Sequence, residues 1–540
     1  MKHMKWYAVM MLLVPMALCI SSCTDDDSSN SPAPVPEPQA EYTILYYANG
    51  GSNVDQCVLP MIEDFYKASA EAYKKVNVVV QYKFSTADNL KNQYDNEDHT
   101  PFAERFVDSY RTYFGSQSVR WVIDPAKTMD EQMKDPANLY GQVNADCTCP
   151  DSLTNFINWA VKAYPAKKYI LVMNDHGHGY RPDEDLPDNM ASEAPTRGVI
   201  FDDGHLLPDG TKKHFTVKNF TRAIRSASVR FETIYMLACL MNNMEYLFEL
   251  KGFCDYIIAS TYIMPDVGGA LNVLVEQLAQ HPTEVEKALD TYCKADVESW
   301  DEGWEIDETT PGYTDLTVTR TANLDKLGEV MREFTDRLCD TYANGTAEQQ
   351  EKIDDCTMHS VKVHLKRPFY DIAKYISSLI IALPEVYGEA FYDEFRETFN
   401  SGLVSQHYSR YLTAHDYQVD YSVLLGAEGA YSYVSTGYSL DEVTGKIIEV
   451  PKTVQLYMGD GTVEIYDLSP INYPATLYES TFNRYGKPWG STLDNTYGQL
   501  EFDRVVGWSR WLKLNRQHPN LFSPAGMKYI LPDDESDTSK

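Results

Sequence analysis

The sequence predicts an α/β fold: a mostly parallel sheet with helices on both of its faces, followed by a C-terminal α+β addition. Four apolar runs with little polar alternation are typical of strands buried on both faces, and they occupy residues 41–48, 76–84, 168–174 and 231–237. Amphipathic segments with helical spacing separate these runs, which favours parallel strands joined by crossover helices.

The first half of the chain alternates strands and helices. A helix over 59–75 joins the first two strands, and a further strand is expected near Trp121. The helix over 151–164 has the clearest pattern, with Asp151 or Ser152 as its N-cap, and it leads into the strand that ends at His176.

A helix over 216–227 leads into the strand that ends at Cys239, and a helix over 241–250 then places Cys239 at a helix N-terminus. The remaining expected elements are a long acidic loop at 181–210 broken by a strand at 198–201, a strand at 255–261, a helix at 271–280, a strand at 314–322, helices at 323–338 and within 366–400, and short antiparallel strands between 420 and 468.

These elements give four predicted regions. Residues 1–22 have a basic start and an apolar stretch too short to cross a membrane as a mature helix, so they are expected to be a signal peptide. Residues 23–40 form a Ser/Pro-rich tether. The main α/β domain is expected over 41–310 and the C-terminal α+β region over 311–540.

Cys23 is the predicted lipidation site. It follows Ile20-Ser21-Ser22, which resembles the lipobox of bacterial lipoproteins, where the cysteine is diacylated and becomes the first residue. The acidic run after it resembles a surface-export signal, although it is also compatible with a simple solvated tether. We therefore expect an outer membrane lipoprotein at the cell surface, with the membrane as a partner through the lipid anchor.

The charge balance argues against nucleic acid as a partner. The formal net charge is −32, and we expect no cluster of Lys and Arg of the kind that neutralises phosphates. The acidity favours solubility and attraction of basic peptides, and we expect a monomer.

The cysteine usage does not indicate a disulfide framework. Cys147 and Cys149 are compatible with a strained disulfide, with a soft-metal site or, as we expect, with two ordinary thiols. The oxygen-rich loop with His205, Asp202, Asp203 and Asp209 is compatible with calcium binding, but a solvated loop is the expected interpretation. No metal and no organic cofactor are predicted, with calcium kept as an alternative.

The residues that we expect to react follow the ends of two predicted strands. A thiol at Cys239 and an imidazole at His176 would meet at the carboxyl edge of a parallel sheet, and Gly177 would let a backbone N–H approach a bound carbonyl. This set suits acyl transfer, with the amides of Gly177 and Cys239 holding the oxyanion. A buried structural cysteine and a structural histidine are the competing interpretation, and His178 is a competing general acid.

The segments YYANGGSNVD, NFINWAVKAYPAKKYILVMNDHGHGY and ACLMNNMEYLFELKGFCDYIIAS resemble the clostripain family of cysteine peptidases, over about half of the chain from Glu41 onward. The resemblance implies a caspase-like fold, a His176/Cys239 dyad and an oxyanion amide at Gly177. It also implies that Glu245 is the family's glutamate, either a brace behind the site or a solvated or capping carboxylate.

One position departs from the family pattern. The family commonly has Asp two residues before the nucleophile, in the pocket that takes Arg or Lys, and here that position is Leu237. Because an apolar residue cannot pair a guanidinium, a basic preference is doubtful, although Asp266 lies near where a second pocket acid can fall.

The predicted function is thus a surface or periplasmic lipid-anchored cysteine endopeptidase acting on polypeptides. The alternatives are a catalytically silent surface binding lipoprotein that uses its C-terminal Tyr and Trp residues, and a cysteine transpeptidase.

Overall fold

The structure, a computed structural model, describes residues 40–50, 54–86, 88, 109–110, 112–115, 117–135, 138–140, 145–177, 179, 198–206, 212–261, 264, 269–302, 314–364, 367–409, 424–426, 433–440, 447–457, 463–467 and 497–517. All of them belong to one structural unit, Ala40–Lys540. The predicted signal peptide and nearly all of the tether lie outside the described residues. Within the described part, none of the helices combines the length and apolar character needed to cross a membrane.

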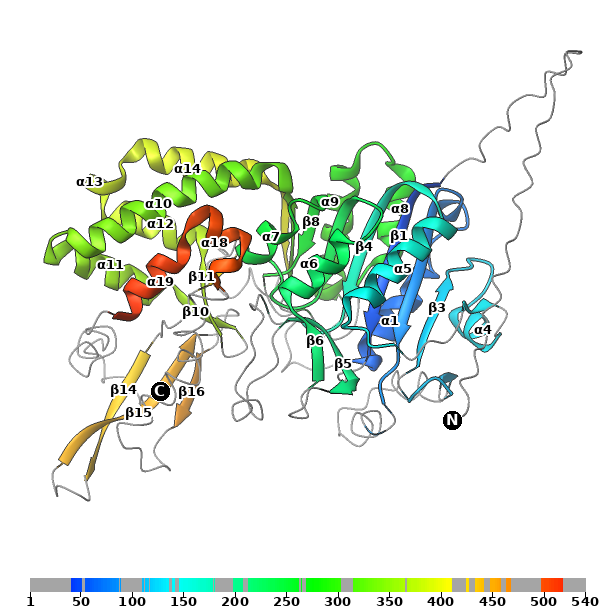
Figure 1. Ribbon diagram of the computed structural model, residues 1–540, viewed down its shortest axis with the longest axis horizontal. Helices are drawn as coiled ribbons and strands as arrows, with labels where there is room; N and C mark the ends of the chain where they lie inside the picture. Colours follow the sequence, from blue (N-terminus) through cyan, green and yellow to red (C-terminus); the bar gives the residue numbers. More distant parts are fainter. Residues whose placement is uncertain are drawn as a thin grey trace, which may run out of the picture. The chain divides into compact units, whose positions relative to one another are not determined.

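The central feature is an eight-stranded sheet with the strand order β12-β9-β8-β7-β4-β1-β2-β3 (Figure 1). Its strands are β1 (Ala40–Asn49), β2 (Val76–Lys83), β3 (Ser118–Val122), β4 (Ala166–Asn174), β7 (Phe231–Leu237), β8 (Cys254–Ala259), β9 (Asp315–Arg320) and β12 (Leu403–Tyr408). The five strands from β8 to β2 are parallel. At the edges, β3 pairs antiparallel with β2, β9 pairs antiparallel with β8, and β12 pairs antiparallel with β9. The predicted mostly parallel sheet is confirmed.

Helices cover both faces of this sheet, as predicted (Figure 1). Alternate residues of β1 point to opposite sides of the sheet. Leu45 packs into the apolar cluster on one side, which we call the α5 face. Ile44 packs into the apolar cluster on the other side, which we call the α1 face. The α5 face carries α5 (Pro150–Ala163), α6 (Val217–Arg225) and α7 (Met244–Leu250), and the α1 face carries α1 (Asp55–Phe65), α8 (Leu271–Gln280) and α9 (Val285–Glu302).

Two helix boundaries differ from the prediction. Helix α5 begins at Pro150, so Cys149 and not Asp151 or Ser152 is at the N-cap position; proline suits the first helical position because it needs no N–H there. Helix α1 ends at Phe65, and the predicted continuation is a turn followed by the short 3-10 helix Ala72–Lys74.

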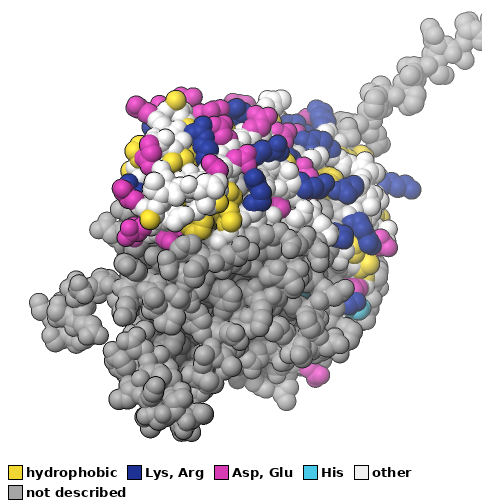
Figure 2. Space-filling model, turned by 60° about the vertical axis from the view of Figure 1, so that its left-hand side comes forward, with side chains coloured by type: hydrophobic (Ala, Val, Ile, Leu, Met, Phe, Trp, Pro, Cys, Tyr) yellow, Lys and Arg dark blue, Asp and Glu magenta, His cyan; other side chains and the backbone are white. Residues whose placement is uncertain are grey.

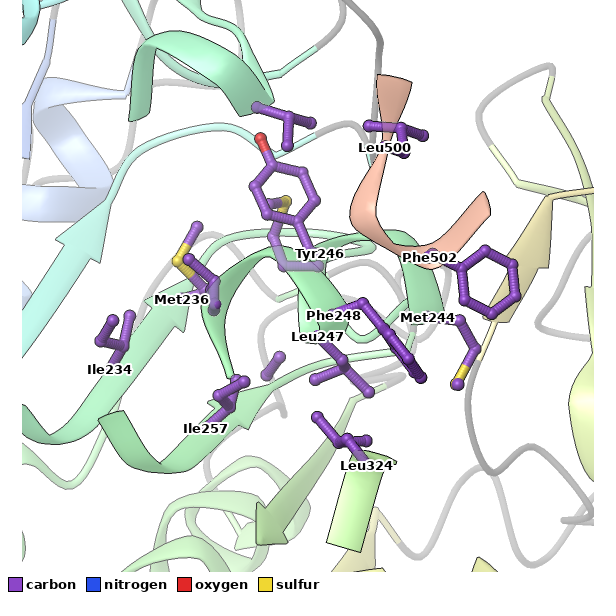
Figure 3. Packing of buried hydrophobic residues seen from close by; sticks show 14 of the residues in the cluster. Ile234, Met236, Met244, Tyr246, Leu247, Phe248, Ile257, Leu324, Leu500 and Phe502 are labelled. Carbon is purple, nitrogen blue, oxygen red and sulfur yellow. The ribbon is translucent and has the colours of Figure 1, made fainter. Parts of the chain in front are cut away.

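The main sheet continues past the boundary predicted at residue 310, since β9 and β12 form its edge. The C-terminal helices pack nearby: α10 (Leu324–Asn344) contacts α14, α18 and α19, and α18 contacts α7. Figure 3 shows Phe248 of α7 next to Phe502 of α18 and Leu324 of α10. These helices are α10, α11 (Ala347–Ser360), α12 (Ile372–Ala382), α13 (Pro384–Tyr387), α14 (Glu389–Gly402), α18 (Glu501–Val506) and α19 (Trp508–Gln517).

Smaller elements complete the described part. The expected antiparallel strands form a sheet of β14 (Tyr433–Leu440), β15 (Ile447–Tyr457) and β16 (Val463–Asp467). The others are α4 (Met129–Lys134), the hairpin of β5 (Val199–Leu206) and β6 (Lys212–Phe215), and a sheet of β10 (Val361–His364), β11 (Arg367–Asp371) and β13 (Leu424–Gly426).

Candidate active site

The segments after β4 and β7 meet at the carboxyl edge of the sheet. Strands β4 and β7 pair in parallel up to Asn174 and Leu237, so His176 and Cys239 each lie two residues beyond this last pair. Gly177 touches the main chain of Cys239: a Cβ built on this glycine would lie 2.3 Å from the Cys239 carbonyl oxygen and 2.8 Å from its nitrogen. The predicted neighbourhood of the two segments is therefore confirmed, and only glycine fits at position 177.

The thiol of Cys239 is half-buried and packs against the apolar clusters of both faces. The main-chain N–H of Met264 donates a hydrogen bond to its Sγ over 3.2 Å, and the Met264 carbonyl oxygen lies 3.9 Å from the sulfur. A donor aimed at the sulfur stabilises negative charge there, which is the charge that a thiolate carries.

The prediction that Cys239 begins a helix is wrong. Helix α7 begins at Met244, and its N-cap is Asn243, whose side chain accepts a hydrogen bond of 3.0 Å from the Tyr246 N–H. Leu240 separates the thiol from this helix with a left-handed φ of 62°. Backbone strain of this kind is common at functional sites. Charge stabilisation at the sulfur therefore comes from Met264 and not from a helix N-terminus.

A carboxylate that the sequence analysis missed organises the His176 segment. Asp175 is buried, and its two oxygens accept hydrogen bonds of 2.6 Å from the N–H groups of His176 and Phe201. The Phe201 ring stands edge-on to the imidazole, with centroids 6.2 Å apart, and Gly177 forms a bridge with Val199. Strand β5 thus supports the histidine segment. The signal available in the sequence was an acid directly before His176.

Glu245 lies in the first turn of α7 and is fully buried, so the solvated interpretation is wrong. Its Oε1 accepts a hydrogen bond of 2.7 Å from the hydroxyl of Tyr497, which is also buried. One turn later, Glu249 accepts a hydrogen bond of 2.6 Å from the N–H of Glu501, and burial raises the pKa of Glu249. The C-terminal segment therefore contacts the helix that follows Cys239. No local sequence signal pointed to Tyr497.

Of the two predicted pocket residues, the structure describes Leu237 only. Leu237 is the last residue of β7, is 3 % exposed, and packs into the apolar cluster of the α1 face. Asp266, His178 and the lipidation site Cys23 lie outside the described residues.

Acidic residues that were considered as calcium ligands surround a lysine at the end of β2. Asp146, Asp202 and His205 bring possible ligand atoms within 4.8 Å of one another. The buried Lys83 Nζ lies 2.6 Å from Asp202 Oδ2 and 3.0 Å from His205 Nδ1, so an ammonium group already supplies the positive charge. This arrangement fits an ion pair better than a calcium site.

Another predicted ligand, Asp203, also has hydrogen-bond partners. Asp203 accepts hydrogen bonds from the N–H and hydroxyl of Thr86, and Asp209 lies outside the described residues. Cys147 and Cys149 are free thiols, so the disulfide alternative is wrong. The Cys147 thiol donates to Asp202 over 3.2 Å, and burial raises its pKa well above the usual value for a thiol.

Known proteins that are similar to this chain are cysteine proteases of one family. The model of the clostripain family (Peptidase_C11) matches residues 127–506. A secreted C11 cysteine protease from Bacteroides thetaiotaomicron in complex with an irreversible peptide inhibitor is 14 % identical, with a TM-score of 0.49, over 87 % of this chain and 99 % of that one. An inactive zymogen C11 protease from Parabacteroides distasonis is 14 % identical, with a TM-score of 0.45 and the same coverage. No curated protein matches the chain.

Proposed function

Since the chain belongs to the clostripain family and is a cysteine peptidase, we propose that Cys239 is its nucleophile and His176 the proton donor and acceptor beside it. The observation that carries this assignment is the contact of Gly177 with the Cys239 main chain, which brings the two segments together at one sheet edge. A thiol and an imidazole placed there form the smallest set that performs nucleophilic acyl transfer.

The proposed reaction follows from these groups. The Cys239 thiolate attacks the scissile carbonyl carbon, and the amides of Gly177 and Cys239 donate to the resulting oxyanion. His176 gives a proton to the leaving amine as the C–N bond breaks, which leaves a thioester on Cys239. Water, deprotonated by His176, then attacks the thioester, and the acid product and the thiol are released. This sequence of steps needs no organic cofactor and no metal.

Asp175 and Glu245 have proposed supporting roles. Asp175 holds the backbone of His176 against that of Phe201, so that the imidazole is presented from a fixed segment. Glu245 braces α7 through Tyr497 and thereby supports the loop that carries Cys239.

The proposed substrate is a polypeptide whose residue before the cleaved bond need not be basic. Leu237 offers no charge to a Lys or Arg side chain, and burying an unpaired cation against it would be costly. Asp266 is the remaining candidate for pairing with a basic side chain.

We also propose that the mature chain begins at a diacylated Cys23 and acts as a monomer outside the cytoplasm, at the outer membrane. Lipid labelling tests this part. Incorporation of labelled palmitate into the wild-type chain, and its loss in Cys23→Ser, is the expected result; labelling that persists in the variant contradicts it.

Replacement of Cys239 by alanine tests the catalytic assignment. We expect hydrolysis of a peptide library to fall to background in Cys239→Ala and in His176→Ala, and an acyloxymethyl ketone probe to label only chains that keep Cys239. Cys254→Ala is the matched control, because Cys254 is fully buried at the start of β8 and has no role in the proposed reaction. Unchanged hydrolysis in Cys239→Ala would show that another residue is the nucleophile.

A further inference from the structure

Helix α6 carries a stripe of exposed positive charge. Lys218, Arg222 and Arg225 are spaced four and three residues apart, so they lie on one side of the helix, and all three are exposed. Within the part of the chain that the structure describes, none of them forms an ion pair. The surrounding sequence from 210 to 231 contains six Lys or Arg residues and no acid, in a chain with 79 acidic and 47 basic residues.

The stripe continues toward the amino edge of the sheet. Lys162 is exposed in the last turns of α5, and Arg230 is exposed just before β7. Lys167 lies at the start of β4, which pairs with the start of β1 in the register Ala40↔Ala166. The amino edge is therefore where the tether enters the folded part. Figure 2 shows a face of the molecule on which Lys and Arg side chains gather toward one side.

Helix α6 thus brings together basic residues that the sequence analysis did not group. Residues three and four positions apart look dispersed in the sequence, but a helix places them on one face. We call Lys162, Lys218, Arg222, Arg225 and Arg230 the basic surface.

Helix dipoles account for only part of this surface. Cations near a helix C-terminus are favourable, and this explains Lys162, Arg222 and Arg225. Lys218, however, lies in the first turn of α6, where a cation is unfavourable. Neighbouring ion pairs compensate two other cations of this edge, since Arg230 pairs with Asp255 at 2.6 Å and Lys167 with Glu41 at 2.6 Å. On α6, Arg225 lies over the Phe253 ring at 5.7 Å and interacts electrostatically with Glu249, whereas Lys218 and Arg222 form no ion pair among the described residues.

We propose that the basic surface binds the phosphate headgroups of the membrane that carries the lipid anchor. This inference rests on the proposed anchoring at Cys23. The tether between Cys23 and Ala40 spans at most about 60 Å when fully extended, which keeps the amino edge close to the bilayer. The anchor makes the contact between the basic surface and the headgroups effectively intramolecular. A few cations therefore suffice to bind this surface to the membrane, even though the chain as a whole is acidic.

Membrane binding of this surface fixes the direction in which the site opens. Cys239 and His176 lie at the carboxyl edge of the same strands whose amino edge carries Lys167 and Arg230. With the amino edge on the headgroups, the nucleophile faces away from the bilayer, toward polypeptides in solution.

Vesicle co-sedimentation tests the proposal. The mature chain with its lipid anchor is used, because the proposed contact depends on the anchor. We expect this chain to partition more strongly onto vesicles of phosphatidylcholine with phosphatidylglycerol than onto phosphatidylcholine alone, and we expect high salt to remove this preference. The combined variant Lys218→Glu, Arg222→Glu and Arg225→Glu should lower the partition coefficient by a factor on the order of 100.

The matched control makes the same change of charge elsewhere. Lys287→Glu, Lys294→Glu and Lys352→Glu alter exposed lysines of α9 and α11, and this variant should bind the anionic vesicles like wild type. Equal loss in both variants, or equal partition of the wild-type chain onto neutral and anionic vesicles, overturns the proposal. Binding to duplex DNA without binding to vesicles overturns it as well, in favour of a nucleic-acid partner.

Hydrolysis of a soluble peptide separates this inference from the proposed function. The α6 variant should cleave the peptide like wild type, since the stripe is not part of the catalytic machinery. A wild-type chain that binds anionic vesicles as expected but cleaves nothing would refute the proposed dyad and leave the basic surface supported.

Discussion

A single methyl group at Gly177 should abolish most of the activity. In Gly177→Ala the new Cβ would lie 2.3 Å from the Cys239 carbonyl oxygen and 2.8 Å from the Ala238 Cβ. An ordinary contact begins near 3.4 Å, so the histidine and cysteine segments must separate by about 1 Å. Because a misplacement of about 1 Å in an active site lowers the rate about 100-fold, we expect kcat/KM to fall by that factor.

The assay compares kcat/KM for a cleavable peptide with the rate of Cys239 alkylation and the midpoint of thermal unfolding. Gly252→Ala is the control, since a Cβ at Gly252 meets no atom within 4 Å and the substitution should leave all three quantities unchanged. A folded Gly177→Ala chain with wild-type kcat/KM would refute the view that contact between these two segments sets the catalytic geometry.

Three further substitutions probe the surroundings of the site. Lys83→Met leaves the carboxylate of Asp202 buried without its ammonium partner, and urea unfolding should show a loss of about 3–5 kcal/mol, whereas a loss near zero would mean that the pair is dispensable. Tyr497→Phe removes the hydroxyl that donates to Glu245, and we expect a loss of about 1.5–3 kcal/mol together with a lower kcat; an unchanged kcat would restrict Tyr497 to a structural role. The hydrogen bonds from Arg320 hold the pKa of Glu286 below its usual 4.5, so the stabilisation by this pair is complete above pH 4.5 and is lost as the pH falls through the lowered pKa. Because both side chains are partly exposed, Glu286→Gln should cost less than about 1 kcal/mol at neutral pH and nothing in strong acid, and a difference that persists in acid would contradict the assignment.

The parallel centre of the sheet could be predicted because its strands are long and apolar on both faces. The run that forms β4 has no polar residue between Tyr169 and Met173, and such a run fits only a strand covered from both sides. The approach of the segments that follow β4 and β7 could be predicted in the same way, since the carboxyl ends of neighbouring parallel strands share an edge.

The local geometry around the thiol could not be predicted, because it depends on main-chain groups. The donor to the sulfur is the N–H of Met264, and every residue except proline has such a group, so its position in the sequence carries no signal. The late start of α7 depends on the left-handed φ of Leu240, a conformation that leucine rarely adopts and that a propensity argument would not assign.

The edge of the main domain was missed for a related reason. Strands β9 and β12 are separated by long helices, and they join the sheet through antiparallel pairing with β8 and with each other. The change in the pattern of strands and helices near residue 310 predicts a domain boundary. Such a pattern reports local structure, however, and not which strands pair with each other.

The loop that carries Cys239 depends on segments from across the chain. Met264 contacts the sulfur, Asn243 caps the helix that follows, and Tyr497 reaches Glu245 from 252 residues away. Phe248 of α7 stacks edge-on against Phe502, with ring centroids 5.3 Å apart, so the same C-terminal segment also supplies apolar packing. A loop with a strained residue keeps its shape only when its surroundings over-determine it. The C-terminal segment is therefore part of the scaffold around the loop of Cys239, and it lies within residues 127–506, the range that the clostripain family model matches.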